Sequence, residues 1–145
     1  MRLSKFISLA AFIMLFAASV VAQNASAPEV RHVPIVNTPS NSGQQMYKSY
    51  CAVCHGVDGK GNGPAAPALK TSPSDLTALA QKNGGKYPSA HVASVIRGQA
   101  ALPSHGSQDM PIWGPLLSSI SQGHEGQVQQ RTANLVAYID TLQAK

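Results

Sequence analysis

The sequence has few of the residues that usually fill a hydrophobic core. All three phenylalanines lie within the first 22 of its 145 residues. Over residues 23–145, Leu, Ile and Val make up about 18% of the chain, below the roughly 20% expected of a self-sufficient globular core. The high net charge that accompanies disorder is also missing. A large apolar cofactor would supply the contacts that this composition lacks.

The chain also lacks the features of two classes of binding protein. It contains only two cysteines, too few for a zinc site that depends on cysteine ligands. The formal net charge is +5, but the lysines are scattered and form no basic cluster. We therefore predict no nucleic-acid partner.

One long apolar run is present, from Phe6 to Val21, and Arg2 and Lys5 lie at its start. Small residues precede a cleavage position after Ala22, so residues 1–22 are predicted to be a signal peptide. The protein would then be periplasmic or otherwise exported. A retained membrane anchor is the second interpretation, and the run is short for a membrane span.

The rest of the chain divides into an extension and one domain. Residues 23–41 contain three prolines and no helical period, which predicts a flexible N-terminal extension. Residues 42–145 have the length of one domain.

The central motif is Cys-Ala-Val-Cys-His, in which Cys51, Cys54 and His55 have the spacing of a c-type haem attachment site. Two thiols on one helical turn can each add to a vinyl group of the same porphyrin edge. The histidine that follows is then held beside the iron and offers a ring nitrogen as the first axial ligand.

Three other interpretations of the cysteine pair are weaker. Half of a zinc site would need further ligands, and no other cysteine is present. A thioredoxin-like pair requires a βαβ context, and no strand-rich pattern lies nearby. A plain structural disulfide remains open from the five residues alone.

Helical patterns flank the motif. Ser42 and Gln45 form a capping-box pattern at the start of a helix that leads into Cys51. Gly43, early in this helix, is costly unless another backbone approaches closely, which predicts a helix crossing. The crossing partner is an amphipathic helix expected over residues 127–143. Shorter helices are predicted over residues 72–84, capped by Ser72 or Thr77, and over residues 89–97, with a loop over residues 99–115.

The second axial ligand is sought in the loop over residues 99–115. Met110 lies beside Pro111 in this loop, where a methionine is unusual as a core residue, and a thioether is a good ligand for haem iron. His105 and His124 are the rival candidates. His91, on the preceding helix, is expected to face solvent.

With these features the chain resembles the class I cytochrome c family over about residues 42–143. The residues that carry the resemblance are Gly43, Tyr47, the Cys-Ala-Val-Cys-His motif, Pro67, Leu69, Met110, Leu135 and Tyr138. The resemblance implies a small all-α fold wrapped around one covalently attached haem c, with crossing N- and C-terminal helices.

The resemblance also implies roles for individual residues. The carbonyl of Pro67 would accept a hydrogen bond from His55, Leu69 would line the haem pocket, and Met110 would be the distal ligand. Arg97 and Trp113 are similar to positions that contact the haem propionates.

The stretch over residues 61–88 looks like single-haem bacterial cytochromes of respiratory chains, including cytochrome subunits of larger complexes. If both axial positions are filled, no open position remains for catalysis, so we expect a carrier of single electrons between protein donors and acceptors rather than an enzyme. The alternatives are a cytochrome subunit of a larger dehydrogenase or oxidase, in a membrane-associated complex, and a haem enzyme or sensor with a displaceable distal ligand.

Overall fold

A computed structural model describes residues 35–100 and 113–144, and these residues contain helices and no β-strand. The first helical stretch has three parts: α2 (Gly43–Met46), a π-helical turn η1 (Tyr47–Cys51) and α3 (Ala52–His55). Ser42 caps α2, because its hydroxyl accepts a hydrogen bond from the backbone N–H of Gln45 at 3.3 Å. The other half of the predicted capping box is replaced, since Ser42 N donates to the carbonyl of Pro39.

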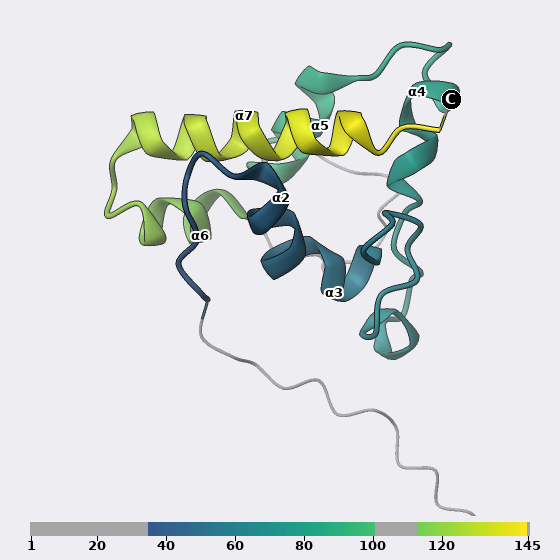
Figure 1. Cartoon of the computed structure of the whole chain (residues 1–145), viewed down its shortest axis with the longest axis horizontal. Helices are drawn as coiled ribbons and strands as arrows, with labels where there is room; N and C mark the ends of the chain where they lie inside the picture. Colours follow the sequence, from purple (N-terminus) through teal and green to yellow (C-terminus); the bar gives the residue numbers. More distant parts are fainter. Residues whose placement is uncertain (1–34, 101–112, 145) are drawn as a thin grey trace, which may run out of the picture.

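The C-terminal helix α7 (Glu125–Thr141) crosses α2 at Gly43 (Figure 1). A Cβ atom at Gly43 would overlap the carbonyl of Asn134 and lie 3.0 Å from Cβ of Tyr138. Beside the crossing, the rings of Tyr47 and Tyr138 pack with their centroids 5.2 Å apart. The predicted crossing is therefore confirmed, and it requires a residue without a side chain.

The segment between the motif and α5 is less helical than predicted. Residues 72–84 form only a 3₁₀ turn, η3 (Leu76–Ala78), and the short α4 (Leu79–Lys82). The N-cap is Asp75 rather than Ser72 or Thr77, because its carboxylate accepts a hydrogen bond from Thr77 N at 2.8 Å. An earlier 3₁₀ turn, η2 (Ala66–Ala68), lies in the loop that follows the motif.

Two helices complete the fold, α5 (Ser89–Ile96) and α6 (Trp113–Ile120). The helix α5 agrees with the prediction, whereas α6 was not predicted. Its first residues include Gly114 and Pro115, which indicated a loop, but a proline in the first helical turn lacks only an N–H that would have no helical partner. A Cβ at Gly114 would lie 2.6 Å from the carbonyl oxygen of Arg97, so the glycine allows α6 to approach the end of α5.

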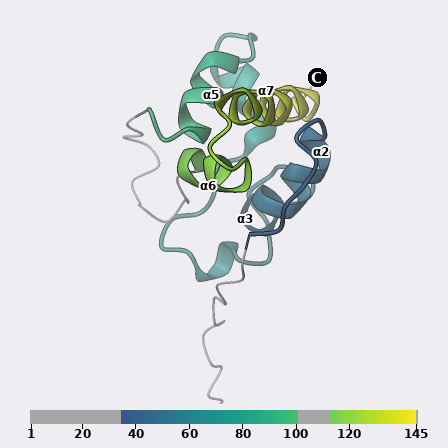
Figure 2. The same ribbon diagram turned by 90° about the vertical axis from the view of Figure 1, so that its left-hand side faces the viewer.

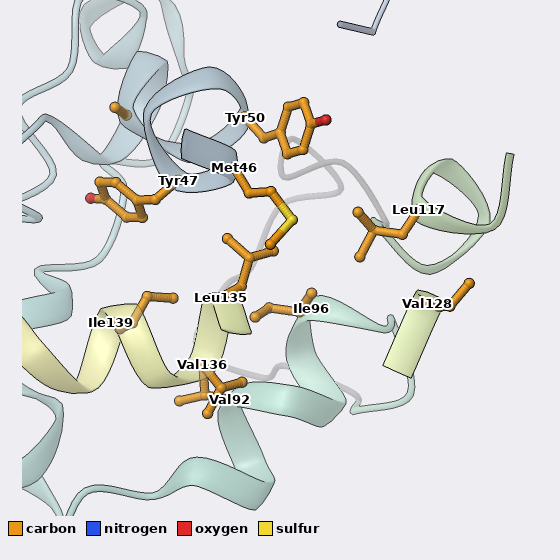
Figure 3. Packing of buried hydrophobic residues seen from close by; sticks show 11 residues of the cluster. Met46, Tyr47, Tyr50, Val92, Ile96, Leu117, Val128, Leu135, Val136 and Ile139 are labelled. Carbon is orange, nitrogen blue, oxygen red and sulfur yellow. The ribbon is translucent and has the colours of Figure 1, made fainter. Parts of the chain in front are cut away.

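In the view nearly along α7, α5 and α2 flank that helix and α6 lies beneath it (Figure 2). Figure 3 shows side chains from all four elements and from η1 meeting in one core. Met46, Tyr47 and Leu117 are completely buried in it. The other buried apolar residues are Tyr50, Ala52, Val92, Ile96, Val128, Leu135, Val136 and Ile139. Most of these side chains are small or medium-sized, so the core is small, as the composition indicated.

The end of the predicted extension is fixed to the domain. Residues 36–40 donate or accept hydrogen bonds with Tyr50, Gln130, Arg131 and Asn134, and Thr38 is only 7% exposed. The prediction of a flexible extension over residues 23–41 is therefore wrong for its last residues; residues 23–34 lie outside the described part of the chain.

Candidate functional site

A cavity lies between the motif, α5 and α7. Its walls are mainly apolar, with Val92, Val95 and Ile96 on α5 and Leu135 and Ile139 on α7. Leu76 and Leu79, from η3 and α4, also line it. The space inside the cavity and its open mouth together measures about 670 Å³.

The motif supplies the polar and reactive groups of this cavity. Cys51 and His55 are on its wall, and Cys54 lies on the same turn, partly buried. The two thiols are not bonded to each other. Burial raises the pKa of Cys51 to about 12 and also raises the pKa of Cys54, so both groups are protonated thiols at neutral pH.

The ring of His55 is held in one orientation. The side chain is 7% exposed, and its Nδ1 lies 3.0 Å from the backbone carbonyl oxygen of Ser74. Because a carbonyl can only accept, Nδ1 carries the proton and Nε2 carries the lone pair. An imidazole fixed in this way is the arrangement found for histidines that ligate a metal.

Ser74 occupies the position that the resemblance assigned to Pro67, so that prediction is wrong. Pro67 is exposed in η2, and Leu69 is not among the residues of the cavity wall. Any residue can supply a carbonyl. In this chain the loop between η2 and η3, which contains Ser74, supplies the one that accepts from His55. Leu76, two residues after Ser74, lines the cavity at the spacing expected for Leu69.

The glycine-rich loop after His55 completes the helix end. Gly61 N donates to the carbonyl of His55 at 2.8 Å, Gly63 N to that of Cys54 at 3.0 Å, and Ala65 N to that of Val53 at 2.9 Å. These carbonyls would otherwise have no helical partner. A Cβ at Gly63 would lie 2.6 Å from the carbonyl oxygen of Ala52, so the approach needs a glycine.

Tyr47 adds a further bond at the same helix end. Its hydroxyl donates to the carbonyl of Gly56 at 2.7 Å, and its ring is completely buried. Burial and the neighbouring thiol of Cys51 raise the pKa of the Tyr47 hydroxyl well above its usual value. The phenol therefore stays protonated and donates its hydrogen bond. This bond from the core fixes Gly56, the residue after His55.

The two residues expected at the haem propionates are separated. Trp113 lies on the cavity wall, and its ring stacks on Tyr50 with the centroids 5.2 Å apart. Arg97 is not on the wall; its guanidinium pairs with Glu125 at 2.8 Å. The structure therefore does not bring Arg97 to the cavity, because its side chain reaches the start of α7 instead.

The histidines other than His55 are also separated. His91 is exposed, as expected, yet it forms part of the cavity mouth. His124, the N-cap of α7, is not on the cavity wall; its Nδ1 lies 2.9 Å from the carbonyl oxygen of Ser121, which follows α6. Met110 and His105 lie outside the described residues.

The order of these features along the chain agrees with a known family. A family model described as Cytochrome c matches residues 40–143. The chain belongs to the cytochrome c family. The predicted all-α cytochrome c fold is confirmed, and membership implies covalently bound haem c and haem-based electron transfer.

The residues present fit a covalently bound haem. The chain offers an apolar cavity with the thiol of Cys51 on its wall, a second thiol at Cys54 on the same turn, and an imidazole with its lone pair on Nε2. Comparisons with curated proteins and with solved structures gave no match. Within residues 35–100 and 113–144, no group of three or more His, Cys, Asp or Glu side chains is placed to hold a separate metal ion. No helix in the described part of the chain is long and apolar enough to cross a membrane.

Proposed function

We propose that the chain is an exported cytochrome c with a single haem, which carries one electron at a time between protein partners. The observation that carries the proposal is the His55 ring, fixed by Ser74 on the wall of an apolar cavity that Cys51 borders. In this proposal Cys51 and Cys54 form the thioether bonds and His55 ligates the iron. When bound, haem supplies an iron that changes oxidation state by one electron.

The protein contributes position and environment. The bond from Nδ1 to Ser74 orients the ring and increases the electron density on Nε2. The walls from α5 and α7 exclude water, which lowers the dielectric constant around the site and favours the less charged, reduced state of the iron. Trp113, the first residue of α6, lines the cavity, and its ring stacks on that of Tyr50.

Met110 is proposed as the distal ligand. The proposal rests on the Asp-Met-Pro sequence and on the position of this loop between α5 and α6, two elements that line the cavity. With His55 and Met110 both bound, the iron would have no open position, so the protein would transfer electrons without acting as an enzyme on small molecules. His/Met ligation also raises the reduction potential.

The proposed number of haems and the proposed location rest on two features of the sequence. A single Cys-x-x-Cys-His motif supports one haem, and the apolar N-terminal run with its cleavage position after Ala22 supports export to the periplasm. We propose the bacterial respiratory type, class I, as the subgroup.

Protein redox partners are the proposed donors and acceptors. Val53 and Val57, at the motif, are 47% and 75% exposed. A partner protein that packs against these two exposed apolar side chains would exclude water next to the motif. The same exposure favours the second candidate, a cytochrome subunit of a larger dehydrogenase or oxidase in a membrane-associated complex.

Visible spectroscopy and a haem stain test the proposal together. The exported protein should show the sharp reduced bands of a c-type haem and should keep its haem stain after denaturing electrophoresis. Cys51→Ala and Cys54→Ala should lower the yield of stained protein strongly, and the double variant should abolish the stain. A stain that survives the loss of both thiols would contradict covalent attachment. Rapid and complete binding of carbon monoxide by the reduced protein would favour a haem enzyme or sensor.

A further inference from the structure

Arg131 on α7 is a buried cation. The residue is 4% exposed, and its guanidinium donates to neutral groups. Nε donates to Ser121 Oγ at 3.1 Å, Nη1 to the carbonyl oxygen of Thr38 at 2.7 Å, and Nη2 to Asn37 Oδ1 at 3.2 Å. Nη1 also lies 3.8 Å from Met46 Sδ. A guanidinium is charged over the whole pH range in which proteins fold, so these bonds solvate the charge without neutralising it.

The acidic side chains in the described residues are engaged elsewhere. Glu125 pairs with Arg97, Asp75 caps η3, and Asp58 accepts from Lys60 N. Asp140 is exposed and lies nine residues further along α7, about 14 Å along the helix axis. Within this part of the chain, no carboxylate therefore faces the guanidinium of Arg131.

Arg131 lies one helical turn of α7 from the cavity wall. Leu135, one helical turn after Arg131, is on the cavity wall. Thr38 links Arg131 to Tyr50, because Thr38 Oγ1 lies 2.8 Å from the hydroxyl of Tyr50. Tyr50 precedes Cys51 and stacks on Trp113, which lines the cavity.

Two of the residues that accept hydrogen bonds from Arg131 lie outside the part of the chain that matches the family model. Asn37 and Thr38 precede the stretch that matches the cytochrome c family, residues 40–143. The N-terminal segment therefore provides part of the polar shell that keeps the charge buried.

We propose that Arg131 raises the reduction potential of the haem through its buried charge, which no carboxylate in the described residues neutralises. The inference rests on the proposed one-electron function. Reduction adds one negative charge to the site, and a nearby positive charge stabilises the reduced state. The interaction is strong in the interior because the dielectric constant is low there. Salt screens it little, because the charge is buried.

The test compares midpoint potentials of the haem-loaded full chain. Arg131→Met removes the charge and keeps much of the volume. Ser121→Asp keeps the arginine and places a carboxylate at the atom that now accepts from Nε, so it neutralises the charge as a pair. Ser121→Asn is its matched neutral control. Lys48→Met removes an exposed cation on η1, three residues before Cys51, and controls for charge at the surface.

We expect Arg131→Met and Ser121→Asp to shift the midpoint potential downward by similar amounts, at both low and high ionic strength. Ser121→Asn should stay near the wild type, and any shift in Lys48→Met should disappear at high salt. Equal potentials for Ser121→Asp and Ser121→Asn would overturn the proposal. If Arg131→Met yields no holoprotein, the comparison of these two Ser121 variants still tests it. Failure of the proposed function is distinguishable, since the wild type itself would then lack covalent haem or a reversible one-electron couple.

Discussion

The carbonyl oxygen of Ser74 lies 3.0 Å from Nδ1 of His55, nineteen residues earlier in the chain. This contact joins the helix that carries the motif to the loop before η3. Two further bonds hold the loop and the helix end together: Leu76 N donates to the carbonyl of Gly59 at 2.7 Å, and Gly61 N to that of His55 at 2.8 Å. The orientation of the histidine therefore depends on the packing of the glycine-rich loop after His55 against the loop that contains Ser74. Gly61 lies where the two loops meet.

Gly61→Ala should disturb this packing. A Cβ at Gly61 would overlap the carbonyl of Pro73, next to Ser74, and Gly61 has a φ of +80°. The left-handed backbone costs any L-residue about 1–2 kcal/mol, and the overlap should add about 1–3 kcal/mol of destabilisation. The His55 ring should also move, which the reduction potential and the Soret band would report.

Gly85→Ala is the matched control. Gly85 has a φ of +86°, but nothing lies within 4 Å of its Cβ position. It should therefore show the backbone cost alone, with an unchanged spectrum. Equal losses of stability in the two variants, measured by guanidinium chloride unfolding, would show that the approach of Gly61 to Pro73 does not matter.

The crossing of α2 and α7 gives a second prediction. Gly43→Ala should destabilise the protein by about 1–3 kcal/mol, because the methyl group overlaps the carbonyl of Asn134, and Gly43→Val should be worse. Gly126→Ala, in α7, meets nothing within 4 Å and should stabilise by up to about 1 kcal/mol through helix propensity. Thermal unfolding of the holoproteins measures these changes in stability. If Gly43→Ala and Gly126→Ala change stability in the same direction, the close approach at Gly43 does not limit the residue at this position.

The sequence predicted the parts of the site that depend on local spacing. Cys51, Cys54 and His55 are adjacent on one turn, and the glycine at position 43 indicated a close helix crossing. Both signals arise within one helix, so a short stretch of sequence contains them. The structure confirms the crossing and places Cys51 and His55 at one apolar cavity.

Contacts made by backbone atoms across loops could not be predicted in the same way. The acceptor for His55 is a carbonyl, which every residue has, so the identity of Pro67 gave no real information about the position. The Ser-Pro-Ser-Asp-Leu stretch ending at Leu76 has the same spacing to a leucine, and its Asp75 cap is the signal that could have selected it. Arg131 was missed because a single arginine in an amphipathic helix is usually exposed, and only tertiary contacts show that it is buried.

Asp75 predicts a pH dependence of stability. The side-chain and backbone hydrogen bonds from Thr77 lower the pKa of Asp75. A carboxyl whose pKa is lower in the folded state contributes stability above its unfolded pKa and loses it as the pH falls through the folded value. Unfolding measured from pH 6 down to pH 2 should therefore show a smaller loss of stability in Asp75→Asn than in the wild type.

Asp75→Ala separates the cap from the charge. It removes the acceptor at every pH and should cost about 0.5–2 kcal/mol at pH 6, the range measured for helix caps. Because Asp75 follows Ser74, its loss should also loosen the loop that orients His55. Identical acid unfolding curves for the wild type and Asp75→Asn would show that the charge of this carboxylate contributes nothing.

Met110 gives a prediction on ligation. If its sulfur is the distal ligand, the oxidised protein should show the weak iron–sulfur charge-transfer band in the near infrared. Met110→Ala should abolish that band, lower the potential and allow the reduced protein to bind carbon monoxide. Met46→Leu is the control, because Met46 is completely buried in the core beside Arg131. A wild-type protein without this band, in which His105→Ala rather than Met110→Ala allows carbon monoxide to bind, would instead indicate that His105 is the ligand.

The small core predicts that the chain does not fold without haem. After residue 22 the sequence has no phenylalanine, and the buried apolar side chains of α5 and α7 form the walls of the cavity. Haem would cover these walls, and without it their apolar surface would remain in contact with water. The remaining contacts are chiefly the crossing at Gly43 and the Tyr47–Tyr138 pair. They would have to offset the conformational entropy lost on ordering the whole domain, which costs roughly 1–2 kcal/mol for the backbone of each residue.

Residues 23–145 made in the cytoplasm, where no haem is attached, should therefore be largely unfolded or a molten globule. The near-ultraviolet circular dichroism should be weak, hydrophobic dyes should bind, and heating should produce no cooperative transition. The same residues exported with haem should unfold cooperatively, which makes the two preparations a matched pair of identical sequence. Sharp near-ultraviolet dichroism in the haem-free chain would show that the polypeptide fills its core by itself and that folding does not depend on haem.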